Sequence, residues 1–214
     1  MRNWAESVPA AIRRFCIKNR RSEYDPIADI HRQCDQCLVN STSICPMPLM
    51  TFIEPAFGLP AWGVKQGYGS FLTFEFGPPK LEVTERHSPE KGLRRWAHVH
   101  GQWHLWINCC HWRALQDGTE VAWSEDNVQV IGQATASLNA QKLVDVRVTP
   151  EDGCSTFAFD LGGALETWPY GDDPTEEQWI IMTDTETFAY RADGHYARGP
   201  SSTPPELERW SPLR

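Results

Sequence analysis

The sequence predicts an α+β protein built mainly from antiparallel β-sheet, with one long packed helix and an N-terminal helical appendage. Three features indicate this: a long segment in which side chains of two kinds alternate, one segment with helical spacing, and a duplicated hairpin. The 214 residues suffice for one domain with a full core plus an appendage. We expect the appendage over residues 1–54 and a single β-rich domain over residues 55–214.

The appendage is predicted to begin with a short helix over residues 1–21. Ile12, Phe15 and Cys16 have the spacing of one helix face. Residues 22–60 are expected to be irregular, because prolines interrupt every candidate element there.

This irregular segment contains a candidate metal site. Its four potential ligands are His31, Cys34, Cys37 and Cys45. Their donor types and spacing could support a small zinc knuckle. The alternative is an extension with incidental thiols, since no second CxxC accompanies the first.

Strands are expected from residue 61 onward. Residues 70–76 are rich in β-forming side chains and end at a Gly-Pro-Pro turn, followed by a short strand over 81–85 and a polar loop over 87–92. A Gln-Asp-Gly turn then leads into a strand over 119–123.

Residues 96–112 form the segment around which we expect the sheet to be organised. If the segment is extended, its odd-numbered side chains form an apolar row suited to a core. Its even-numbered side chains form a second row of indoles, imidazoles and amides. Gly101 is expected to mark a bulge or a bend.

One long helix is predicted over residues 125–139. Ser124 is a candidate N-cap, and one face carries an apolar stripe that would pack on the sheet. The residues of that stripe are Val128, Ile131, Thr135 and Leu138.

An internal repeat relates residues 156–179 to residues 187–210 at a constant offset of 31. Both copies share Thr-Phe-Ala, a turn glycine, two prolines, a glutamate and a final tryptophan. We interpret the repeat as a β-meander of related hairpins, because two copies are fewer than a solenoid needs.

Composition limits the partners and the compartment. The net charge is −8, and residues 51–214 carry 13 Lys or Arg against 23 Asp or Glu, so binding to nucleic acid or to a membrane surface is disfavoured. The sequence has no bilayer-length apolar run and no secretory h-region. We therefore expect a cytoplasmic protein whose seven cysteines are reduced.

The even-numbered row offers two functional hypotheses. As a binding surface it supplies aromatic anchors with polar handles. Its members are Trp96, His98, His100, Gln102, His104, Trp106, Asn108 and Trp112. The alternative is that the predicted helix or the N-terminal segment covers this row as a second small core.

His98 and His100 could also hold a metal ion together, with His104 joining them if the chain bends at Gly101. The His-x-His pattern invites comparison with cupins. The sequence departs from that motif, because His104 stands where the motif has glutamate. Solvent-facing or core-satisfied histidines are the plainer interpretation.

Other catalytic signals are weak. Cys110 and His111 are adjacent, so on a strand they would point to opposite faces and could not form a nucleophile–base pair. No serine elbow, P-loop or dinucleotide fingerprint is present.

Four segments resemble small uncharacterised bacterial cytosolic proteins of β-rich α+β build. They are residues 69–77, 101–106, 159–166 and 177–179. Some proteins of this kind are immunity proteins, so the resemblance implies a protein that occludes a toxin partner. It covers about residues 61–210 and identifies no active site.

We therefore predict a non-catalytic, cytosolic, immunity-like protein that needs no cofactor and binds a protein partner. The acidic chain would suit a basic partner, because opposite charge steers association. The alternative is an enzyme that uses zinc or another divalent metal, centred on His98 and His100.

Overall fold

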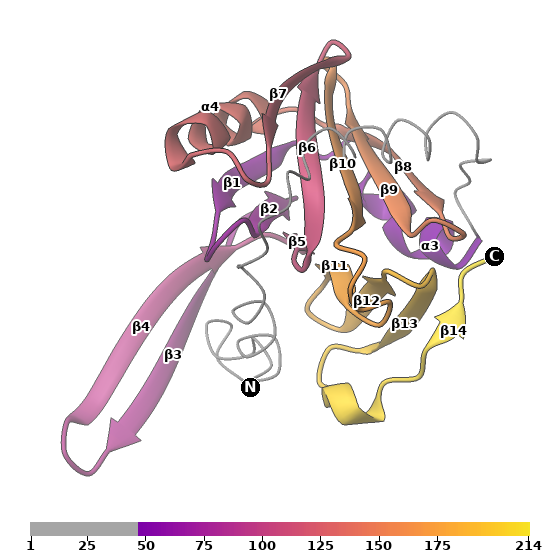
Figure 1. Cartoon of the computed structure of the whole chain (residues 1–214). Coiled ribbons are helices and arrows are strands. Elements are labelled where there is room, and N and C mark those ends of the chain that lie inside the picture. The colour runs from indigo at the N-terminus through magenta and orange to yellow at the C-terminus, as the bar shows by residue number, and fades with distance from the viewer. Residues whose placement is uncertain (1–46) are drawn as a thin grey trace.

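The computed structural model describes residues 47–214 (Figure 1). All strand pairs in this range are antiparallel. A seven-stranded sheet has the order β1 (Ala61–Gln66), β2 (Leu72–Phe76), β5 (Trp103–Ile107), β11 (Glu177–Met182), β12 (Glu186–Arg191), β13 (His195–Pro200) and β14 (Ser211–Pro212).

A five-stranded sheet packs beside it, in the order β7 (Thr119–Trp123), β6 (Cys110–Gln116), β10 (Gly163–Pro169), β9 (Cys154–Phe159) and β8 (Leu143–Thr149). Strands β3 (Lys80–Ser88) and β4 (Gly92–His100) pair only with each other. The predicted antiparallel α+β class is confirmed.

Two α-helices accompany the sheets in the described range: α3 (Met47–Ile53) and α4 (Val128–Leu138). Two 3₁₀ turns, η1 (Glu54–Ala56) and η2 (Pro205–Leu207), complete the elements. Leu49, Phe52 and Ile53 of α3 are buried, so this helix belongs to the same core as the strands. None of the described helices has the length and hydropathy that crossing a membrane requires.

Helix α4 confirms the predicted helix but begins later than expected. Its N-cap is Asn127, whose Oδ1 accepts hydrogen bonds from the amides of Gln129 at 3.0 Å and Val130 at 3.1 Å. Ser124 is therefore not the cap. Val128 falls in the first turn and is 72% exposed, whereas the other three stripe residues are buried as predicted.

Aromatic packing joins the two large sheets. Trp179 of β11 is fully buried, and its ring lies 5.5 Å from that of Phe157, 5.9 Å from Phe188 and 5.0 Å from Tyr190, measured between centroids. Phe157 belongs to the five-stranded sheet and the others to the seven-stranded sheet. Such aromatic contacts add about 0.5–1.5 kcal/mol each beyond the burial of their area.

The two copies of the duplicated hairpin occupy different places in the sheets. The first copy (residues 156–179) contains most of β9 and all of β10 in the five-stranded sheet and then the start of β11 in the seven-stranded sheet. The second copy (residues 187–210) contains most of β12 and all of β13, both in the seven-stranded sheet. Phe157 and Phe188 occupy equivalent positions, and both pack on Trp179. Trp210, the equivalent of Trp179, instead lies at the surface, where the Arg191 guanidinium stacks 4.5 Å from its ring centroid.

The expectation of one long central strand over residues 96–112 is wrong. The segment is divided among β4, β5 and β6, which belong to three different sheets. Gly101 makes the first break: a Cβ there would lie 2.5 Å from the carbonyl oxygen of Phe76 and 2.9 Å from that of Trp103. The chain turns where only a residue without a side chain can approach this backbone.

The predicted apolar row holds only after this break. Trp103, Leu105 and Ile107 of β5 are buried, as an apolar core row requires. Ala97 and Val99 of β4 are exposed, because that strand has left the body of the protein. The predicted helix over residues 1–21 and the ligand set His31, Cys34, Cys37 and Cys45 lie outside the described residues.

We expect Gly101→Ala to destabilise the protein by about 1–3 kcal/mol, because the added methyl group would overlap backbone atoms that cannot move independently. Gly132→Ala in α4 is the matched control, since a Cβ at that position would have no neighbour within 4 Å. That variant should gain about 0.5–1 kcal/mol from helix propensity. Urea unfolding of both variants measures the difference, and equal effects would contradict the assignment of Gly101 as a steric constraint.

Candidate functional site

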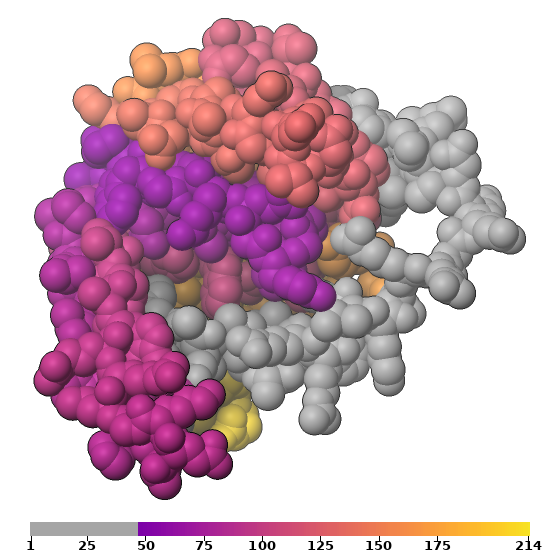
Figure 2. Space-filling model, turned by 90° about the vertical axis from the view of Figure 1, so that its left-hand side faces the viewer, coloured from indigo at the N-terminus to yellow at the C-terminus, as the bar shows by residue number. Residues whose placement is uncertain are grey.

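Strands β3 and β4 form a free-standing hairpin, hereafter the arm (residues 80–100). The two strands pair in continuous register from Lys80 opposite His100 to Ser88 opposite Gly92. Nine residues at about 3.3 Å each give it a length of about 30 Å. It projects away from the two large sheets (Figure 1) and stands out as the magenta lobe of the space-filling view (Figure 2).

One face of the arm carries exposed apolar side chains, interrupted toward the tip by the Glu85–Arg95 ion pair. Leu81 lies opposite Val99, and Val83 lies opposite Ala97, so their side chains share this face. Leu93 continues the row toward the tip. We call this row the apolar stripe (Leu81, Val83, Leu93, Ala97 and Val99). The exposed fractions of Leu81 and Val99 are 68% and 53%, values that a packed sheet would not show.

The opposite face carries Trp96, His98 and His100 beside Glu82. His98 Nε2 lies 3.0 Å from Glu82 Oε2, and His100 Nε2 lies 3.9 Å from the same oxygen. The two imidazole rings are 6.2 Å apart between centroids. His98 and His100 therefore share a face, as the sequence predicts. The prediction missed Glu82, which only its position opposite His98 across the strand pair could have indicated.

The donors on this face do not form a complete metal site. Among residues 47–214, no three His, Cys, Asp or Glu side chains are grouped so that they could hold a metal ion. Glu82 acts instead as a hydrogen-bond partner that fixes the orientation of His98.

A partly buried carboxylate, that of Glu75, secures the base of the arm. Glu75 Oε2 accepts a hydrogen bond from the Gly101 amide at 2.8 Å, and Glu75 Oε1 lies 2.7 Å from His104 Nδ1. Lys80 forms an ion pair with Asp184 of the β11–β12 turn. The first and last residues of the arm region are thus tied to the seven-stranded sheet, so the direction of the arm is defined at its base.

The remaining predicted binding residues do not form one surface. Trp96 is 43% exposed on the arm, and Gln102 is exposed at its base. Trp106 is half-buried beside the nearly buried His104. The continuous binding face expected over residues 96–112 is absent, because the segment changes sheet twice.

Asn108 and Trp112 are buried, so the prediction that they belong to a binding surface is wrong. Asn108 is 1% exposed and Trp112 is fully buried, with its Nε1 donating a hydrogen bond to the Ser70 carbonyl at 2.6 Å. Neither side chain can contact a partner in this structure. Trp112 belongs to the core because β6 turns this side toward the other sheet.

The described cysteines also differ from expectation. Cys109 is disulfide-bonded, so the prediction of reduced thiols does not hold at that position. Cys110 and Cys154 are not disulfide-bonded. Burial raises the pKa of the Cys110 thiol far above its usual range, so this thiol is not a nucleophile.

Charge is divided unequally between the arm and the rest of the described chain. The arm carries five Lys or Arg against three Glu, a net charge of +2. Residues 47–79 and 101–214, here called the body, carry eight Lys or Arg against 20 Asp or Glu, a net charge of −12. The arm is therefore a basic projection on an acidic body.

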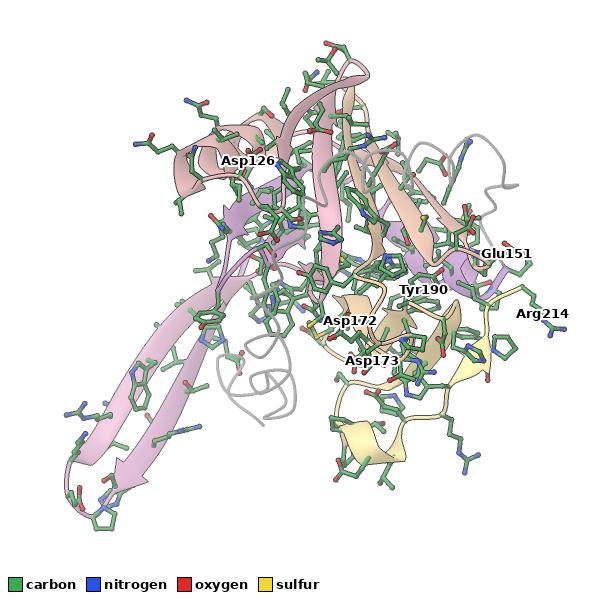
Figure 3. All side chains as sticks on the ribbon, viewed as in Figure 1. Asp126, Glu151, Asp172, Asp173, Tyr190 and Arg214 are labelled. Atoms are coloured by element: carbon green, nitrogen blue, oxygen red, sulfur yellow. The ribbon has the colours of Figure 1, made fainter. Side chains whose placement is uncertain are left out.

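Acidic side chains gather near the start of β11 and the C-terminal strands. Figure 3 shows Asp172 and Asp173 close together in the loop before β11. The pKa of Glu176 is raised to about 7, mainly because the carboxyl group is partly buried and secondly because Asp172 and Asp173 are negatively charged. The pKa of Glu208 is also raised to about 7, mainly by burial and secondly by the negative charge of Glu177. Ionising these carboxyl groups at neutral pH costs free energy of folding.

No family model matches the chain, and searches of curated proteins and of solved structures return no match. The arm and its two faces are therefore the features of the described chain from which a function can be inferred.

We expect stability to fall as the pH rises, through the raised pKa of Glu208. The folded state holds the Glu208 proton more tightly than the unfolded state does. This proton therefore adds fully to the free energy of unfolding below about pH 4.5, and the added stability is lost as the pH rises through about 7. Glu208→Gln should flatten that fall and raise the midpoint of thermal unfolding at pH 8. The exposed Glu206→Gln is the control, and an equal effect of the two substitutions would contradict this explanation.

Proposed function

We propose that this chain is a non-catalytic binding protein and that the arm is the element that contacts a protein partner. The observation that carries the proposal is the apolar stripe, which is held in water on a hairpin that nothing in the described body covers. Exposed apolar patches framed by polar residues are typical of protein–protein interaction sites. An enzyme would place its chemistry in a concave site, whereas this element is convex.

The energetics of the arm favour a covered state. A two-stranded hairpin alone is marginally stable in water, since one of its faces must be buried to offset the loss of chain entropy. Each leucine or valine side chain of the stripe would contribute about 1.5–3 kcal/mol if a partner buried it fully. A partner therefore gains affinity from the stripe and stabilises the arm at the same time.

The opposite face adds specific contacts. Trp96 is a large aromatic side chain with a polar N–H group, and tryptophan is enriched among the residues that dominate binding energies. His98 is oriented by Glu82, so it offers its imidazole in a defined position. An immunity-like role would follow if a partner toxin is occluded by the arm, with the acidic body steering a basic partner toward it.

We expect Leu81→Asp combined with Val99→Asp to abolish partner binding while the body stays folded. Val144→Asp is the matched control, because Val144 is 46% exposed on β8 of the body. Affinity capture with the three proteins identifies a partner that only the stripe variant loses, and calorimetry with that purified partner then measures the affinity. A partner bound equally by all three proteins would contradict the proposal.

A second candidate function is a metal-dependent enzyme centred on His98 and His100. The observation that favours it is Glu82, which adds a carboxylate beside the two imidazoles as a third potential ligand. The separations of 3.0 and 3.9 Å to one oxygen would have to adjust before the three groups could share an ion.

Elemental analysis of the purified protein separates the two functions. The enzyme requires stoichiometric zinc, iron or manganese that is lost in both His98→Ala and His100→Ala. Metal that is lost only in Cys34→Ser would place it in the appendage instead. We expect no metal loss from either histidine substitution, because the binding function does not use these imidazoles as ligands.

A further inference from the structure

We propose that the arm of one copy docks on the acidic body of a second copy, whose arm docks in return, so that the chain forms a symmetric, arm-exchanged dimer. This inference rests on the proposed function, since it requires the arm to be a docking element. It goes further by naming the occupant as a second copy of this chain.

Charge complementarity identifies the occupant. The arm has a net charge of +2 and the body a net charge of −12, so the same chain contains both halves of a complementary pair. Basic residues lie toward the tip, including Lys91 and Arg94. An acidic surface attracts such a tip and orients the arm during encounter.

Apart from Lys80 at its base, the arm does not reach the described body of its own copy, residues 47–79 and 101–214. It projects away from the two large sheets (Figure 1), and Gly101, Glu75 and Lys80 fix its direction at the base. At a length of about 30 Å, its tip lies several screening lengths from the body, since the Debye length is about 8 Å at physiological salt. Within residues 47–214 no acidic surface lies beside the tip, and we assign the complementary surface to a second copy.

The area argues for reciprocal docking. One face of a two-stranded arm, about 30 Å by 10 Å, covers about 300 Å², so a single docked arm buries about 600 Å² on both sides together. Specific interfaces need more than about 1,000 Å². Two exchanged arms bury about 1,200 Å² and close the assembly around a two-fold axis, which prevents open-ended filaments.

Sedimentation analysis of the full chain at about 100 μM tests the proposal, because a dimer with a dissociation constant of about 10 μM or tighter is mostly populated at that concentration. We expect a dimer at low salt that dissociates as ionic strength rises, because salt screens the charge attraction. Lys91→Glu with Arg94→Glu changes the arm from +2 to −2 and should weaken dimerisation at least about tenfold. Leu81→Asp with Val99→Asp should also give a monomer.

Lys65→Glu with Lys142→Glu is the matched control, because it makes the same charge change on exposed positions of the body. This variant should remain dimeric. Circular dichroism of every variant confirms that the sheets are intact, so that a monomer is not mistaken for an unfolded chain.

A wild-type monomer under these conditions would overturn the proposal, as would a dimer that is insensitive to charge reversal in the arm. Binding of a short DNA or RNA duplex by a monomeric chain, lost in Lys91→Glu with Arg94→Glu, would assign the arm to nucleic acid instead. A monomeric chain whose stripe variant loses a different protein partner would leave the proposed function intact while removing the dimer. The two proposals therefore fail separately.

Discussion

The close approach of the Gly101 backbone to Phe76 is the constraint on which the arrangement of this protein depends. Strands β2 and β5 are antiparallel neighbours, and the whole arm is inserted in the connection between them. The chain must leave the sheet after Phe76 and return at Trp103, so the two crossing segments have to pass at backbone contact distance. The Glu75 carboxylate then fastens this crossing by accepting the Gly101 amide and binding His104.

The second organising interaction is the aromatic packing around Trp179, which joins the two large sheets. Phe157 and Phe188 reach it from equivalent positions of the duplicated hairpin, one in each sheet. The duplication therefore contributes to the core twice, although its two copies have different neighbours. Trp210 shows the difference: it occupies the position of Trp179 in the repeat, but it lies outside the strands, just before β14, and its half-buried ring stacks against Arg191.

Local patterns predicted much of this fold, because alternation, turn chemistry and helical spacing act over a few residues. The strand over 119–123 and the buried face of α4 follow from such patterns. The path of residues 96–112 could not be predicted in the same way. Alternation shows that a segment is extended, but it does not show which sheet the segment joins, and Ala97 and Val99 have the side chains of a core without being in one.

The same limit applies to the candidate site. The shared face of His98 and His100 follows from the period of a strand, whereas Glu82 becomes their neighbour only through cross-strand pairing. Alternation places Trp112 on that face only if the row is continuous. The break at Asn108 and Cys109 turns β6 into the five-stranded sheet, so the indole is buried and binds the Ser70 carbonyl.

The insertion of the arm between two neighbouring strands separates its evolution from that of the core. The five side chains of the apolar stripe contribute nothing to the packing of the large sheets, so substitutions there meet little selection from folding itself. The ribbon can therefore diversify in length as well as in sequence, while the crossing at its root stays fixed. A protease that nicks the tip would leave two fragments still held together by the β2–β5 ladder.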